Sequence, residues 1–262
     1  MVMGDYPMEF WICAVLAVVL IGISKAGFGS GVGILATPLL ALTVPVTDAL
    51  GLVLPLLIGC DIFSILHYRK SYDRRCVKLL LIGAMIGTAL GAAFFNRFRF
   101  NRRGLQWLIG ILALLFVAFQ ILRSKITRLV EKRRPRAGSG IGMGFISGFT
   151  STMAHAGGPP VTMYLLPQKL PRHIFVGTHV IFFAVLNAVK LVPYGYLGIM
   201  NVRHLWTALM LAPFIFAGVR LGIYLNRNFN ELWFIRVIYV ILFLTGLQLM
   251  LGKSLLKVVM GL

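Results

Sequence analysis

A glycine-rich break, Lys25-Ala-Gly-Phe-Gly-Ser-Gly-Val-Gly33, interrupts the hydrophobic N-terminal part of the chain, and a second break, Ala154-His-Ala-Gly-Gly-Pro-Pro160, interrupts its second half. Four short apolar segments flank the two breaks: residues 8–24, 34–44, 141–153 and 161–166. Glycine permits tight backbone geometry that other residues avoid. Unwound backbone at membrane depth requires protein or a water-filled cavity to satisfy its polar groups. The two breaks therefore predict two helical hairpins within a membrane.

The composition of the chain excludes a water-soluble fold. Of its 262 residues, 59% are hydrophobic and 13% are charged, and a soluble domain of this length cannot cover so much apolar surface. A membrane-spanning helix needs about 20 predominantly apolar residues. Six longer apolar runs come close to this length: residues 46–67, 77–95, 105–122, 173–192, 204–225 and 232–251. We therefore expect an all-α polytopic membrane protein.

The second half of the chain repeats the pattern of the first. Each half contains a broken hairpin followed by three long apolar runs, and local matches recur at offsets of 126 to 131 residues. The matching residues are Pro45 and Gly51 with Pro171 and Gly177, Gly87 and Gly91 with Gly218 and Gly222, and Asn96-Arg97 with Asn226-Arg227. This recurrence indicates a duplication. It predicts a first transmembrane repeat (1–122), a basic cytoplasmic linker (123–138) and a second transmembrane repeat (139–262).

The net charge of +19 would indicate nucleic acid binding in a soluble protein, but here the basic residues lie in short loops between apolar runs. If each hairpin enters and leaves on one side, each half has three full spans and the halves are inverted. The loops at 68–78, 123–140, 167–172 and 226–231 then share one side with 15 Lys and Arg, against 7 on the other. The positive-inside rule places this side in the cytoplasm and both termini outside. Four full spans per half would instead give parallel repeats with both termini inside, and this alternative stays open.

The residues of both breaks resemble a known family. The stretch from Lys25 to Pro38 resembles the glycine-rich first signature of the TauE/SafE sulfite-exporter permeases, and His155-Ala-Gly-Gly-Pro-Pro160 resembles their second signature. Ser30 stands where many members have glycine. The resemblance covers essentially the whole chain. It implies a multi-pass transporter of the bacterial inner membrane, not an enzyme, that moves sulfite or an organosulfonate such as sulfoacetate, usually outward.

The resemblance implies no cofactor, and it makes a small anionic sulfur compound and membrane lipids the partners. It leaves a homodimer open. A helix that begins at a break presents free N–H groups and the positive end of its dipole, which favours an anion. We therefore take as candidate substrate-binding residues Lys25, Gly27, Gly29, Ser30, Gly31, Ser151, His155, Gly157, Gly158, Lys190 and Arg220. The hydroxyl groups beside the breaks, which include those of Thr150 and Thr152, can donate to sulfonate oxygens or to local helix carbonyls.

Asp61, Lys190 and Arg220 lie within long apolar runs, where an ionisable side chain is costly and is a functional hypothesis by default. Asp61 aligns with Asn187, three residues before Lys190, so an Asp61–Lys190 ion pair is the structural interpretation. In the functional interpretation, Lys190 or Arg220 adds positive charge to the anion path, and Asp61 or His155 couples protons to transport. Arg220 lies between the duplicated glycines of its run, where close helix packing favours an inward position.

Two other functions are weighed against an anion exporter. An intramembrane hydrolase is conceivable because Ser151 and His155 have helical i, i+4 spacing, but the sequence shows no third member of a catalytic triad. A cation or metal carrier needs clusters of acidic, His or Cys residues, and the three cysteines have neither CxxC spacing nor His partners, so we expect no metal site. His67, His173 and His204 lie near the ends of spans and are expected at the membrane interface.

Overall fold

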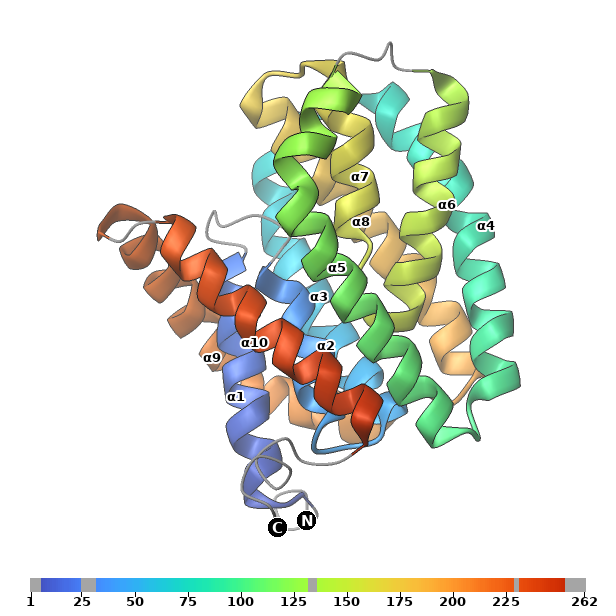
Figure 1. Cartoon of the computed structure of the whole chain (residues 1–262), viewed down its shortest axis with the longest axis vertical. Coiled ribbons are helices and arrows are strands. Elements are labelled where there is room, and N and C mark those ends of the chain that lie inside the picture. The colour runs from blue at the N-terminus through green and yellow to red at the C-terminus, as the bar shows by residue number, and fades with distance from the viewer. Residues whose placement is uncertain (1–5, 25–31, 132–135, 229–230, 253–262) are drawn as a thin grey trace. The chain divides into compact units, whose positions relative to one another are not determined.

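The computed structural model describes residues 6–24, 32–131, 136–228 and 231–252, and within them the chain is helical with no strand. The elements are α1 (Met8–Ile23), η2 (Val32–Leu35), α2 (Ala36–Ala41), α3 (Val46–Tyr68), α4 (Arg74–Phe98), α5 (Arg102–Glu131), α6 (Ala137–Ala154), α7 (Gly158–Leu165), η3 (Leu166–Gln168), α8 (Arg172–Tyr196), α9 (Val202–Asn228) and α10 (Glu231–Leu251) (Figure 1). The all-α prediction is confirmed.

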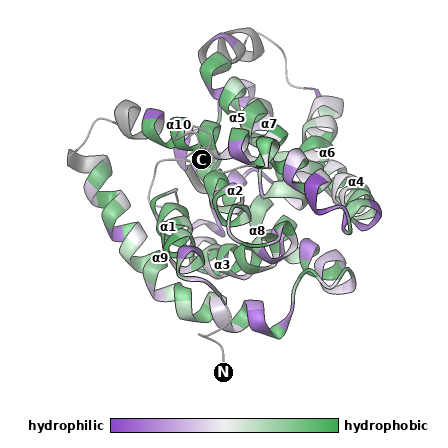
Figure 2. Ribbon diagram, turned by 60° about the horizontal axis from the view of Figure 1, so that its bottom comes forward, coloured by the Kyte–Doolittle hydropathy of each residue, from purple (hydrophilic) through white to green (hydrophobic). Residues whose placement is uncertain are grey.

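Five helices in the described part of the chain are long and apolar enough to cross a membrane: Val46–Tyr68, Arg74–Phe98, Arg102–Leu122, Arg172–Tyr196 and Val202–Leu225. These are five of the six predicted spans. The sixth falls on α10, whose segment Arg236–Leu251 is a shorter apolar helix, as is α1. Hydrophobic residues, green in Figure 2, make up much of these helices, and many large apolar side chains are exposed on them. Such surfaces are compatible with lipid rather than water, so the chain is a polytopic membrane protein.

The second predicted hairpin lies where the sequence places it. Helix α6 ends at Ala154, and His155 takes a left-handed conformation with φ 52°. The His155 N–H then donates to the Ser151 carbonyl at 3.0 Å, the single bond of an αL cap, and the Ala156 N–H donates to the Thr150 carbonyl at 3.3 Å. Helix α7 begins at Gly158, and two prolines follow in its first turn. The fixed φ of proline suits the start of a helix, but α6 cannot continue through these prolines because they lack the backbone N–H that a helix interior needs.

The first predicted hairpin is described on both flanks of its break. Helix α1 ends at Ile23, and η2 and α2 follow from Val32 to Ala41. The candidate residues Lys25, Gly27, Gly29, Ser30 and Gly31 lie outside the described residues. The predicted linker begins as helix, because α5 continues to Glu131, and α6 starts at Ala137.

The chain forms two compact units, and each unit takes segments from both sequence halves. Unit 1 contains Met1–Leu56, Arg97–Val117 and Ile199–Leu262, and unit 2 contains Leu57–Asn96 and Ala118–Gly198. Helices α3, α4 and α5 each contribute residues to both units. The compact units therefore do not follow the predicted sequence repeats.

In unit 1, α1 packs closely against α9. Gly22 and Gly218 lie at this contact. A Cβ on Gly22 would be 2.5 Å from the Ile215 carbonyl oxygen, and a Cβ on Gly218 would overlap the Val19 carbonyl. Small residues that let two backbones approach in this way are typical of helix pairs in membranes.

In unit 2, α4 and α6 make the same kind of contact. A Cβ on Gly148 would overlap the carbonyl of Ala84, and a Cβ on Gly87 would overlap the carbonyl of Phe145. Beside this pair, the buried side chains of Leu80, Val161, Phe182 and Leu186 form the apolar core of the unit together with Cys76, Ala84, Tyr164 and Leu165. The α6–α7 hairpin is thus anchored to α4 and α8.

Unit 2 also contains the contact between the C-terminal part of α3 and α8. Gly177, near the start of α8, lies against the Ser71 carbonyl just beyond the end of α3. Ten residues further along α8, the Asn187 amide donates a hydrogen bond of 2.6 Å to Asp61, ten residues back from Ser71. The two helices therefore run antiparallel.

Candidate functional site

Lys190 is a fully buried cation at the α6–α7 break. It lies on α8, has an exposed fraction of 0%, and extends its ammonium group to the end of α6. Its Nζ lies 3.0 Å from Ser151 Oγ and 2.9 Å from His155 Nδ1. The structure thus brings together three residues that the sequence analysis selected as candidates for substrate binding.

The ammonium group also lies near the negative end of α6. The last carbonyls of a helix lack intrahelical partners and carry its negative dipole end. Lys190 Nζ donates to the Ser151 carbonyl at 3.5 Å, and the Tyr194 hydroxyl donates to the Thr152 carbonyl at 2.8 Å. Tyr194 is fully buried and its ring lies edge-on to His155. Tyr194 therefore satisfies the Thr152 carbonyl, and Lys190 is a second donor to the Ser151 carbonyl, which also accepts from the His155 N–H.

The contacts of Lys190 determine which way its partners can donate. An ammonium group has donors and no acceptor, so His155 Nδ1 must accept and the proton of a neutral imidazole lies on Nε2. Likewise, Ser151 Oγ accepts from Lys190, which leaves its own proton to donate. His155 is partly exposed, whereas Ser151 is buried. The buried cation thus orients two donors, one of them at the accessible edge of the break.

One face of α8 holds the polar groups of this site. Asn187, Lys190 and Tyr194 occupy positions i, i+3 and i+7, which share a face of a helix. Asn187 binds the carboxylate of Asp61, which is buried with an exposed fraction of 2%, and the charge of Asp61 also acts on Lys190. The amide of Asn187 is therefore a direct hydrogen-bond partner of the buried carboxylate, one turn of α8 before Lys190.

The hydroxyl groups near the second break divide into two kinds. Thr150 and Thr152 donate to the carbonyls of Ile146 and Gly148 at 2.8 Å each, within their own helix. Ser151 instead contacts Lys190. Of these three neighbouring hydroxyl groups, the one on Ser151 is the one turned to the buried cation.

The start of α7 offers fewer backbone donors than an ordinary helix N-terminus. Pro159 and Pro160 follow Gly158 in its first turn, and proline has no N–H. Gly157 packs closely: a Cβ there would lie 2.6 Å from Ser147 Oγ, which donates to the Gly157 carbonyl at 2.8 Å. The positive charge at this break therefore comes from Lys190 more than from the amides of α7.

Comparison with known proteins adds the family. The family described as "Sulfite exporter TauE/SafE" matches residues 14–249. The chain belongs to the TauE/SafE family. No curated protein and no solved structure matches it significantly. As a TauE/SafE protein it is a multi-pass membrane transporter of an exporter family, and its family consists of transporters rather than enzymes.

For this TauE/SafE protein, the structure places the side chain of Arg220 on the exposed surface of α9. Arg220 was expected to face inward because it lies between the duplicated glycines Gly218 and Gly222. Gly218 is indeed buried against α1, but the Arg220 side chain is exposed on α9. A glycine at a helix contact shows only which face of the helix is buried at its own position. A residue two positions later lies about 200° around the helix.

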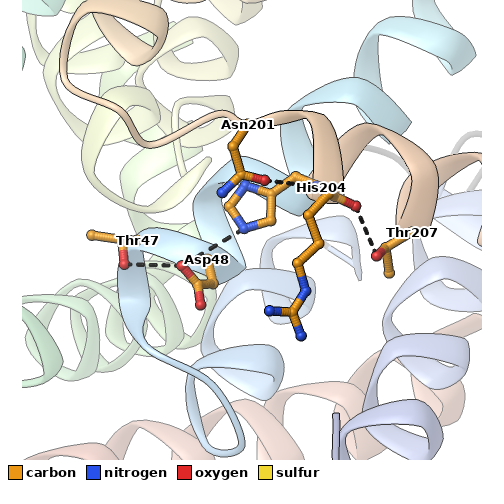
Figure 3. A network of polar contacts seen from close by, with 6 residues as sticks. Thr47, Asp48, Asn201, His204 and Thr207 are labelled. Carbon is orange, nitrogen blue, oxygen red and sulfur yellow. Dashed lines mark hydrogen bonds and ion pairs between the residues drawn. The ribbon is translucent and has the colours of Figure 1, made fainter. Parts of the chain in front are cut away.

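The TauE/SafE chain also holds a polar pair that sequence reasoning missed. His204, expected at the membrane interface, is buried, with 3% of its side chain exposed. Its Nε2 lies 3.6 Å from Asp48 Oδ1, and its backbone N–H donates to Asn201 Oδ1 at 2.9 Å. Figure 3 shows the imidazole directed at Asp48, whose carboxylate also meets Thr47. Both residues belong to unit 1, at the starts of α3 and α9.

Proposed function

We propose that this protein exports a small sulfur-containing oxyanion, sulfite or an organosulfonate such as sulfoacetate, across the bacterial inner membrane. The cargo binds at the α6–α7 break beside Lys190. The observation that carries this assignment is the fully buried ammonium group held between Ser151 and His155. An ionisable group within a membrane span is costly and is retained where it serves a transport path.

The donors oriented by Lys190 fit the proposed cargo. A sulfite or sulfonate group presents three oxygens that accept hydrogen bonds, and hydrogen bonds to charged groups are stronger than neutral ones. His155 offers an Nε2–H at the partly exposed edge of the break, and Ser151 offers a hydroxyl proton beside the cation. A cargo anion there adds a second negative charge near Lys190, in addition to the charge of Asp61.

The membrane potential supplies a driving force for this direction of transport. A negative potential inside the cell favours the exit of an anion by about 2.3 kcal/mol per charge per 100 mV. A uniporter with the proposed site can therefore export its cargo without a coupling ion. Coupling of protons through Asp61 or His155 is not required by the energetics.

We further propose that the two halves are inverted repeats. The helix contacts support this proposal, because they match between the units. Gly22 and Gly148 are 126 residues apart, as are Val19 and Phe145. Gly22 contacts Ile215 on α9, and Gly148 contacts Ala84 on α4. Ile215 and Ala84 are 131 residues apart. The α1–α9 contact and the α6–α4 contact are therefore equivalent, with the roles of the halves exchanged.

The contact of α3 with α8 supports the inverted over the parallel arrangement. These helices occupy equivalent places in the two halves, and Asp61 and Asn187, which touch, are 126 residues apart. Contact between equivalent residues of antiparallel helices is what a two-fold axis perpendicular to them produces. Parallel repeats would bring equivalent helices together in the same direction.

The experiment that tests the cargo class measures efflux from proteoliposomes. Purified protein is reconstituted, the vesicles are loaded with sulfite, sulfoacetate, taurine, sulfate or phosphate, and efflux is followed at a fixed membrane potential. Lys190→Gln removes the buried charge and Lys190→Arg keeps it. Lys78→Gln is the matched control, because Lys78 is an exposed lysine on α4.

Efflux of sulfite or sulfoacetate at rates well above those of taurine, sulfate and phosphate is expected for the wild-type protein. Lys190→Gln should reduce this efflux at least about ten-fold, which corresponds to losing about 1.4 kcal/mol of interaction with the anion, and Lys78→Gln should leave it unchanged. If the wild-type protein releases neither sulfite nor sulfoacetate, the cargo class is refuted. Equal efflux by wild type and a correctly folded Lys190→Gln variant would refute the site.

A further inference from the structure

The Asp48–His204 pair is a titratable site in unit 1 that the proposed cargo site does not use. Asp48 lies in the first turn of α3, and His204 lies near the start of α9. Their side chains differ in exposure, with 36% for Asp48 and 3% for His204. The pair therefore joins a buried imidazole to a carboxylate that reaches the outside of the unit.

The imidazole of His204 has one nitrogen with a partner and one without. Nε2 faces Asp48 at 3.6 Å. Among the described residues, Nδ1 is buried and has no hydrogen-bond partner. It lies against Gly51 instead, where a Cβ would be only 2.5 Å from Nδ1 and would also overlap the Ile199 carbonyl. The close approach of α3 to the Ile199 carbonyl leaves no room beside this nitrogen.

This geometry has a preferred protonation state. A neutral imidazole with its proton on Nε2 places the donor toward Asp48 and leaves Nδ1 as a buried acceptor without a partner, which costs less than an unpaired N–H on a charged ring. A protonated imidazole has N–H groups at both positions, and the Nδ1–H would then be a buried donor without an acceptor. The attraction of a partly exposed carboxylate at 3.6 Å is screened by solvent and does not compensate a buried, unpaired donor.

The charged and titratable groups around the pair come from three elements. Arg203, the neighbour of His204 on α9, acts on Asp48 electrostatically, and its guanidinium group lies 4.2 Å from the centre of the Tyr6 ring. Helix α1, which packs on α9, carries the exposed Glu9 in its first turn. On α3, Thr47 contacts Asp48 at 3.3 Å. Only His204 among these groups is buried with a nitrogen left unpaired in the described part of the chain.

The fold itself does not require the pair, because the equivalent place in unit 2 lacks it. There the Ser71 carbonyl lies on Gly177 as the Ile199 carbonyl lies on Gly51. Asp73 Oδ1 accepts from the Cys76 N–H as Asn201 Oδ1 accepts from the His204 N–H. Cys76 thus stands where His204 stands, and the same backbone packing forms without an imidazole.

We propose that Asp48 and His204 form a proton-binding site that controls the packing of α3 on α9. The described packing belongs to neutral His204, and protonation favours a state in which the start of α3 moves off the imidazole and Nδ1 gains an acceptor or water. In the inverted topology proposed above, both residues lie near the outer face of the membrane. The site therefore responds to the pH outside, and acid there accelerates transport by releasing this contact.

The first test does not involve the cargo, so it stays valid if the proposed cargo is wrong. Unfolding in mixed SDS micelles is measured at pH 8 and pH 5 for the wild type, His204→Gln and His173→Gln. Glutamine keeps a donor toward Asp48 but takes up no proton, and His173 is an exposed control. The wild type and His173→Gln should both be less stable at pH 5 than at pH 8. This loss of stability should be larger in both than in His204→Gln. Equal pH dependence in all three proteins would refute the site.

The second test measures transport by the full chain in proteoliposomes, with the outer pH varied at a fixed inner pH and membrane potential. Wild-type efflux should rise at least about five-fold from pH 8 to pH 5, the lower range of allosteric coupling, and the rise should be lost in His204→Gln. Asp48→Asn, which keeps the hydrogen-bonding shape, serves as a second variant and should change the size of the rise. A wild-type rate that falls with acid, or a rise retained in both variants, overturns the proposal. A proton flux that accompanies each transported anion, seen with a trapped pH dye, also overturns it in favour of a coupled carrier.

Discussion

The substitution Gly148→Ala tests the contact of α4 with α6 on which the cargo site rests. A Cβ at this position would overlap the Ala84 carbonyl oxygen and would lie 2.7 Å from the Ala84 Cα, against about 3.4 Å for an ordinary contact, so α6 must move by more than about 0.7 Å. Overpacking of this kind costs about 1–3 kcal/mol, whereas alanine in place of glycine gains up to about 1 kcal/mol of helix propensity. If the full gain in helix propensity is realised, the net loss of stability is about 0–2 kcal/mol.

Gly142→Ala is the matched control for this prediction. Gly142 lies on the same helix, six residues away, and a Cβ there meets nothing within 4 Å. Both variants gain the same helix propensity, so the difference between their free energies of unfolding in an SDS titration isolates the overpacking term of about 1–3 kcal/mol. If the two variants unfold at the same SDS concentration, the close contact of Gly148 with Ala84 is not present in the protein.

Two further predictions concern the polar face of α8. Tyr194→Phe removes the donor to the Thr152 carbonyl and should cost about 1–2 kcal/mol of stability in the same titration, whereas Tyr196→Phe, at an exposed position, should cost nothing measurable; an equal effect of both would contradict the capping role. Asn187→Leu leaves the buried carboxylate of Asp61 without its amide and should destabilise by about 3 kcal/mol, and adding Asp61→Leu should recover part of this loss. A double variant less stable than the single one would show that the amide does not serve the carboxylate.

The sequence predicted the second hairpin because its signals are local. A glycine pair followed by Pro159 and Pro160 cannot continue a helix, and it can begin a new one, so the break between α6 and α7 lies where the pattern puts it. The apolar runs likewise predicted the long helices, because in lipid nearly every residue of a span must be apolar. Helix ends and membrane spans depend on residues close in the chain.

The arrangement of the polar residues was less predictable, because it depends on residues far apart in the chain. His204 was expected at the membrane interface from its position near a helix end, but its burial within the protein was not predicted. Its burial results from Gly51, 153 residues earlier in the chain, which lets the Ile199 carbonyl and the imidazole approach α3. The recurrence of Gly51 as Gly177 was visible in the sequence, but nothing in it indicated which segment each glycine contacts.

The contacts of Lys190 were likewise only partly predictable from the sequence. Its position in an apolar run marked it as a buried cation, and Asp61 was considered as its partner. The structure places the ammonium group on Ser151 and His155, and gives Asp61 the amide of Asn187. The alignment of Asp61 with Asn187 pointed to two residues that touch, and this contact became apparent only with the helices in place.

The interleaving of the two units has a consequence for how the protein is made. Helix α1 leaves the ribosome long before α9, its packing partner, has been synthesised. The face of α1 around Gly22 therefore lacks its partner helix during most of translation. A gene cut within 132–136 would yield two fragments, neither of which contains a whole compact unit. Each fragment made alone should be degraded, and the two made together in one cell should assemble.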